Sequence, residues 1–224
     1  MAALAEIPLD ELENTSARRI EIRQAIKIIM DEMSYDVSCG DLSPSKIQAN
    51  KLELYFKQSK LDFYLPRNNL DFLNFFGELS YPKYKTLPES YPLFKNHSDK
   101  KDDQLNRADK IVRQMIRNQT RTIYFMDGHG RFLYCFLQKV FELDPENINN
   151  YQIHLFDSSE HATKWHQLLL NNINTIECLT IDAYQVLINQ RTTRSYVYLN
   201  FCSISTFIKM NSIRKETGTE DGSV

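Results

Sequence analysis

The chain has 224 residues, a formal net charge of −2, 42% hydrophobic residues and 12% aromatic residues. This composition excludes a disordered or low-complexity chain, and no apolar run is long enough to predict a membrane span. The segment Met1 to Glu13 lacks an apolar signal core, and the four cysteines are scattered without a Cys-x-x-Cys pair. We therefore expect an intracellular protein without disulfides or a bound metal.

The first part of the chain predicts two helices followed by an irregular segment. Apolar side chains recur at helical intervals over 16–33, and 46–59 is a second helix candidate, with Ser43-Pro44 as a plausible helix entry. Residues 61–94 are rich in Tyr and Phe and are interrupted by prolines, so we expect packed irregular structure with at most short helices. We assign a helical and aromatic-rich N-terminal region to residues 1–100.

From residue 101 onward, helical and strand patterns alternate. Helices are predicted at 104–118, 131–142, 160–170 and 183–189, and strands at 122–126, 151–156, 175–181 and 196–201. Such alternation predicts a mostly parallel sheet covered on both faces. We therefore predict an α/β, Rossmann-like domain over 101–210, followed by a polar tail over 211–224.

Polar residues follow or lie within each predicted strand near its end. Asp127, Asp157 and Asp182 follow the first three strands, and Asn200 lies near the end of the fourth. Two of only six glycines, Gly128 and Gly130, flank His129 directly after Asp127. Ligands of open α/β sheets bind beyond the carboxyl ends of the strands, where glycines allow close approach and an acidic side chain can accept from ribose hydroxyls. The pattern therefore predicts a nucleoside-like ligand.

Residues 105–205 resemble the class I S-adenosylmethionine-dependent methyltransferases, on the segments Ile123-Tyr-Phe-Met-Asp-Gly-His-Gly130, Ile153-His-Leu-Phe-Asp157, Leu179-Thr-Ile-Asp182 and Val197-Tyr-Leu-Asn-Phe201. The resemblance implies S-adenosylmethionine as cofactor, with the Asp127–Gly130 turn at its methionine end, Asp157 on the ribose and Asp182 near the adenine. It also implies that Asn200 orients the methyl acceptor.

The chain departs from that family in three respects. The glycine spacing of the first motif is one residue shorter, Asn200 is not followed by a Pro-Pro-aromatic signature, and about twenty residues follow the fourth strand, where the family has a fifth strand. The alternative is therefore a methyltransferase-like binding or scaffold subunit without catalysis.

Other interpretations of the same residues remain open. The Asp-Gly-His-Gly turn is similar to a metal-binding segment of type-two-C protein phosphatases, but further Asp-Gly and Gly-Asp pairs of that class are missing from the body of the domain. The turn is also compatible with an ordinary strand-to-helix connection. Asp157 and Asp182 are equally suited to cap the helices that follow, Asp157 as the first residue of an Asp-Ser-Ser-Glu capping box.

A basic stripe is predicted on the helix over 104–118. Its members are Arg107, Lys110, Arg113 and Arg117, which share the side opposite the apolar positions. Such a stripe is suited to nucleic-acid phosphates, although a solvated helix face can have the same composition. Nucleic acid and a partner protein subunit are thus the candidate partners.

Overall fold

The computed structural model describes residues 9–31, 44–59, 62–77, 101–127, 130–182, 185–186 and 195–198. The helices are α1 (Leu9–Asp31), α2 (Lys46–Ser59), α3 (Asn69–Phe76), α5 (Lys101–Arg117), α6 (Arg131–Leu143) and α7 (Glu160–Leu170), with 3-10 turns η1 (Asp62–Tyr64) and η2 (Pro145–Asn150). The strands are β1 (Thr122–Phe125), β2 (Gln152–Asp157), β3 (Ile176–Thr180) and β4 (Tyr196–Tyr198). Within these ranges no helix combines the length and apolar character needed to cross a membrane.

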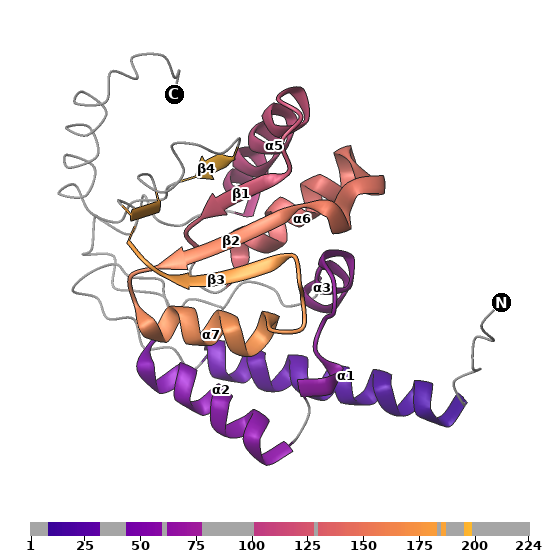
Figure 1. Cartoon of the computed structure of the whole chain (residues 1–224). Coiled ribbons are helices and arrows are strands. Elements are labelled where there is room, and N and C mark those ends of the chain that lie inside the picture. The colour runs from indigo at the N-terminus through magenta and orange to yellow at the C-terminus, as the bar shows by residue number, and fades with distance from the viewer. Residues whose placement is uncertain are drawn as a thin grey trace.

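The four strands form one parallel sheet in the order β3-β2-β1-β4 (Figure 1). Ile123 of β1 lies opposite Ile153 of β2, which in turn lies opposite Ile176 of β3. The chain therefore runs from β1 outward to β3 and returns to place β4 on the other side of β1. This arrangement confirms the predicted α/β fold with a Rossmann-like parallel sheet.

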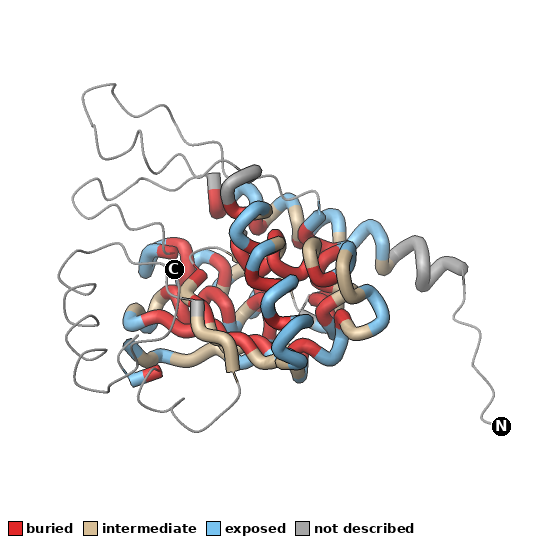
Figure 2. The backbone as a smooth tube through the Cα atoms, turned by 90° about the horizontal axis from the view of Figure 1, so that it is seen from above, coloured by how far each residue is buried: buried red, intermediate tan, exposed pale blue. Residues whose placement is uncertain are grey.

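One face of the sheet is covered by helices. Ile123 and Phe125 of β1 and Ile153 and Leu155 of β2 are at most 2% exposed, and they belong to a single core with apolar side chains of α5, α6 and α7. The buried side chains of α5 lie on one side of that helix, as the sequence predicts: Ala108, Ile111, Val112 and Met115. Figure 2 shows this concentration of buried residues among the helices.

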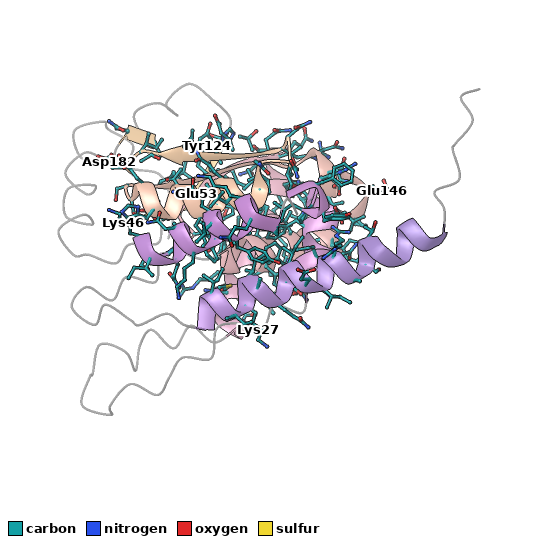
Figure 3. All side chains as sticks on the ribbon, turned by 90° about the horizontal axis from the view of Figure 1, so that it is seen from below. Lys27, Lys46, Glu53, Tyr124, Glu146 and Asp182 are labelled. Atoms are coloured by element: carbon teal, nitrogen blue, oxygen red, sulfur yellow. The ribbon has the colours of Figure 1, made fainter. Side chains whose placement is uncertain are left out.

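The opposite face of the sheet is covered differently. Phe156 of β2 is buried there against Val186, and Tyr124, Leu179 and Val197 pack around them. In Figure 3 the labelled Tyr124 lies on the far side of the strands from α1. The sequence predicts helices on both faces of the sheet. The structure shows long helices on one face, and on the other face the helical residues that it describes are 185–186.

The N-terminal helices share the same core as the α/β segment. Asn69, at the start of α3, donates through Nδ2 to the carbonyl oxygens of Ile148 (2.9 Å) and Tyr151 (3.1 Å), and its Oδ1 accepts from the hydroxyl of Thr175 (2.9 Å). Lys164 of α7 forms an ion pair with Glu53 of α2. The predicted N-terminal region is thus packed directly on the sheet-bearing part.

Local signals explain where these helices begin and end. Ser45 and Gln48 form a reciprocal capping box at the start of α2, because the Ser45 hydroxyl accepts from the Gln48 N–H (3.3 Å) and Gln48 Oε1 accepts from the Ser45 N–H (2.8 Å). Asn68 caps α3 through the N–H of Asp71 at 2.8 Å. Helix α1 begins at Leu9, earlier than the predicted Ser16.

Candidate functional site

The candidate site is the carboxyl edge of the sheet, where β1 and β4 are neighbours. The direction of the chain reverses at this pair, since β2 and β3 lie on one side of β1 and β4 on the other. Ligands of open α/β sheets bind outside the strand ends at such a switch point. The segment after β1 contains Asp127 and Gly130, two of the predicted site residues.

Asp127 is buried, with 6% of its surface exposed, and both carboxylate oxygens bind the start of α6. Oδ1 accepts from the N–H of Phe132 (3.2 Å) and Oδ2 from the N–H of Leu133 (2.8 Å). These amides belong to the first turn of a helix, which has no intrahelical acceptors for them. Asp127 thus brings its negative charge to the positive end of the α6 dipole.

Gly130 immediately precedes α6 and has a left-handed backbone, with φ 88° and ψ 13°. L-residues with a side chain adopt this conformation at a cost of roughly 1–2 kcal/mol, so glycine is the residue that fits here. A Cβ built at Gly130 meets no heavy atom of the described residues within 4 Å. Within the described part of the chain, the turn therefore leaves space beside the backbone at the switch point.

Asp157 ends β2 and is 8% exposed. Its Oδ1 accepts from the N–H of Ser159 at 2.8 Å, which closes a turn between the strand and α7. The cap of α7 is Ser159, whose hydroxyl accepts from the N–H of Ala162 at 3.4 Å. The predicted capping box that begins at Asp157 is therefore wrong: Asp157 is still paired with Thr180 in the sheet, and the helix begins after Ser159.

Asp182 follows β3 and is exposed. Its Oδ1 accepts from the N–H of Gln185 at 2.9 Å, and its carbonyl oxygen accepts from the N–H of Val186 at 3.2 Å. Asp182 therefore caps a helical turn, which is one of the two interpretations of this residue drawn from the sequence. In Figure 3, Asp182 lies at the opposite end of the strands from Glu146, which precedes β2.

The carboxylates of Asp127, Asp157 and Asp182 thus lie at the ends of three adjacent strands, β1, β2 and β3, along the carboxyl edge of the sheet. Gly128, His129 and Asn200 lie outside the described residues, as does most of the helix predicted over 183–189. No group of three potential metal ligands occurs in the part of the chain that the structure describes.

The predicted basic stripe lies on the outer side of α5. Arg107, Lys110, Arg113 and Arg117 are all exposed. Arg113 is held by Asp109 through two hydrogen bonds, at 2.8 and 3.1 Å, and these bonds lower the pKa of the Asp109 carboxyl. Gln114 of α5 accepts from the hydroxyl of Tyr196 in β4 at 3.3 Å, so the helix lies beside the strand that completes the switch point.

Three side chains, those of Tyr124, His154 and Glu177, form a row across the second face of the sheet that the sequence patterns did not predict. The rings of Tyr124 and His154 are stacked, with centroids 4.1 Å apart and planes at 6°, and His154 Nδ1 lies 2.7 Å from Glu177 Oε2. The three residues are aligned by the register of β1, β2 and β3. The sequence does not reveal this row, because each strand alone shows one polar residue between apolar neighbours and the register of the strands is not known from sequence.

Comparisons with protein families, with curated proteins and with solved structures found no match for this chain.

Proposed function

We propose that the chain binds S-adenosylmethionine at the carboxyl edge of the sheet and transfers its methyl group to an acceptor. The strand order β3-β2-β1-β4 is the observation that carries this proposal. It creates a switch point beside Asp127 and Gly130, and it aligns Asp157 and Asp182 along the same edge on the adjacent strands. A row of carboxylates is suited to a ligand rich in hydroxyl and amino donors and with a positively charged group.

The environment of Asp127 favours a nucleoside over a nucleotide. A helix N-terminus in a Rossmann-like sheet commonly holds a phosphate through its free amides. Here the Asp127 carboxylate already accepts from the amides of Phe132 and Leu133. A phosphate at this position would meet a buried negative charge at close range, whereas a sulfonium or ammonium group would be attracted by it.

The proposed roles follow the order of the strands. The Asp127–Gly130 turn, with Gly128 and His129, lines the methionine end of the cofactor, and the open space beside Gly130 allows close approach. Asp157 accepts from the ribose hydroxyls, because it ends β2 at the carboxyl edge, where an acidic side chain of such a sheet is placed to bind a ribose. Asp182 lies near the adenine, and Asn200 orients the acceptor.

The cofactor supplies a methyl group on a positively charged sulfur. When bound, it would supply this methyl group to a lone pair of the acceptor and would keep the electrons of the broken bond on sulfur as a neutral thioether. Such a reaction depends chiefly on holding the two reactants in line. The task of the chain is therefore to position the groups, and the buried carboxylate of Asp127 offsets the positive charge of the bound cofactor.

The second candidate function is binding without catalysis, as a scaffold subunit. It is favoured by the structural roles of two acidic residues, because Asp127 accepts hydrogen bonds from the start of α6 and Asp182 caps a turn. Under this alternative the switch point binds the same nucleoside but no methyl group leaves it.

Isothermal calorimetry with S-adenosylmethionine and S-adenosylhomocysteine tests the proposal. We expect heat of binding from both ligands and a loss of at least tenfold in affinity for Asp157→Ala, since a charged hydrogen-bond acceptor contributes about 1.5–3 kcal/mol. The matched control is Glu146→Ala, which removes an exposed carboxylate at the opposite end of the strands. Absence of heat at millimolar ligand rejects the cofactor, and binding without transfer to any nucleic-acid or protein acceptor supports the scaffold alternative.

A further inference from the structure

The outer side of α5 carries charge of one sign in a chain that is negative overall. The formal net charge is −2, yet the exposed positions of α5 between residues 106 and 117 hold four cations, two amides and one apolar residue: Asn106, Arg107, Lys110, Arg113, Gln114, Ile116 and Arg117. All of these side chains are exposed. The nearest described carboxylate on the helix is Asp109, at the margin of this side, where it binds Arg113.

This pattern differs from that of a helix face that is merely solvated. A solvated face usually alternates positive and negative residues, which pair at intervals of three or four positions. The α1 helix shows such a pair in Arg18 and Glu21, and α6 shows another in Lys139 and Glu142. On α5 the Arg113–Asp109 pair is of this kind, and Asp103 precedes Arg107 by four positions. Lys110 and Arg117, in contrast, have no acidic residue three or four positions away.

The dimensions of the basic side are those of a short stretch of nucleic acid. Ten residues separate Arg107 from Arg117, which corresponds to about 15 Å along the helix. One strand of a duplex places a phosphate about every 3.4 Å along its axis, so this length covers about four nucleotides. Four cations therefore face a comparable number of phosphates.

The orientation of α5 brings one end of its basic side close to the candidate site. The helix ends at Arg117, and β1 begins at Thr122 and runs back alongside it toward the carboxyl edge of the sheet (Figure 1). The bond between Tyr196 and Gln114 fixes α5 beside β4. The basic side thus extends along the sheet next to the β1–β4 pair, with Arg107 at the end nearer to the carboxyl edge.

We propose that the outer side of α5 binds the phosphate backbone of a nucleic acid and guides it toward the carboxyl edge of the sheet. This inference goes beyond cofactor binding, and it does not require it. If the methyl-transfer proposal also holds, the nucleic acid is the source of the acceptor.

Salt-dependent binding of a fluorescein-labelled nucleic acid of about 20 nucleotides, single-stranded and duplex, tests this proposal without any cofactor present. The variant Arg107→Gln, Lys110→Gln, Arg117→Gln removes three cations from the stripe. We expect its affinity at low salt to fall about tenfold or more, and the slope of log K against log salt to shrink by about 2 for the single strand and about 3 for the duplex. Arg113 is left in place because Asp109 holds it.

The matched control is Lys27→Gln, Lys46→Gln, Lys51→Gln, which removes the same charge from exposed positions of α1 and α2. Lys27 and Lys46 are labelled in Figure 3. The control keeps the affinity and salt slope of the unmodified chain. Equal behaviour of the two triple variants, or no binding by the unmodified chain at low salt, overturns the proposal. Polyglutamate that binds as tightly as the nucleic acid also overturns it, and assigns the stripe to an acidic protein partner. Lys110→Glu alone must weaken binding too, which keeps the test decisive if the triple variant is unstable.

Discussion

The buried His166 predicts a loss of stability in mild acid. His166 lies on α7 with 3% of its surface exposed, and its Nε2 has no hydrogen-bond partner among the described residues. Burial lowers the pKa of His166 from 6.5 to about 4, and a hydrogen bond to the backbone of Ala162 offsets part of this effect. The folded chain therefore keeps His166 neutral at a pH where the unfolded chain binds a proton.

The sign of the effect follows from this difference in proton binding. Well above pH 6.5 both states are neutral at His166, and the residue contributes no pH dependence. As pH falls from about 7.5 toward 4, the unfolded state gains a proton first, so the free energy of unfolding falls by up to about 1.4 kcal/mol per pH unit. The separation of the two pKa values corresponds to a total of about 3 kcal/mol below pH 4, of which about 1.3 kcal/mol is lost between pH 7.5 and 5.5.

Urea unfolding between pH 7.5 and 5.5 measures this loss, with Trp165 as the fluorescent reporter because it is the only tryptophan and is fully buried. In His166→Leu the part of the acid slope due to this residue disappears, whatever the stability of the variant at pH 7.5. The control Gln167→Ala changes an exposed, uncharged side chain of the same helix and keeps the original slope. If His166→Leu retains the full slope, the neutral buried imidazole is not its cause.

Two further predictions concern positions that hold the fold around the site. Gly130→Ala lowers the free energy of unfolding by about 1–2 kcal/mol because of the left-handed backbone, and Gly130→Asn lowers it less; equal unfolding midpoints for Ala and glycine would refute the conformational argument. Asn69→Ala leaves the carbonyls of Ile148 and Tyr151 without their donor and costs roughly 2–4 kcal/mol. Asn74→Ala, exposed on the same helix, stays within about 0.5 kcal/mol in the same urea titration, and a comparable loss there would remove the special role of Asn69.

The regular elements were predictable wherever local periodicity decides the structure. Helices α2 and α7 have the predicted bounds, because their apolar positions recur every three or four residues and each begins after a serine cap. The strands were predictable because short apolar runs end at aspartates. The early start of α1 at Leu9 was missed, since its first turns lack that apolar spacing.

The details of the site depend on tertiary structure that sequence patterns do not contain. Asp157 and Ser159 are both good capping residues, and only the pairing of Asp157 with Thr180 decides that Ser159 caps α7. Asp127 binds amides five and six residues later, a spacing outside the usual capping rules.

The face of the sheet on which each described helix lies also follows from tertiary topology. Right-handed crossovers place α6 and α7 on the same face when β1, β2 and β3 follow in one direction, and the return to β4 requires the opposite face, where Val186 lies. The strand order, which patterns of single segments do not reveal, therefore decides which side each helix covers.

The anchoring of the N-terminal helices has a consequence for the order of folding. Asn69 binds carbonyls 79 and 82 residues later, and Lys164 pairs with Glu53 across 111 residues of chain. During synthesis α1, α2 and α3 leave the ribosome before α6 and α7, so the apolar surface that α3 packs on α6 and α2 packs on α7 stays exposed until those helices have been made. Full burial of the first third of the chain is accordingly a late event that depends on the remainder.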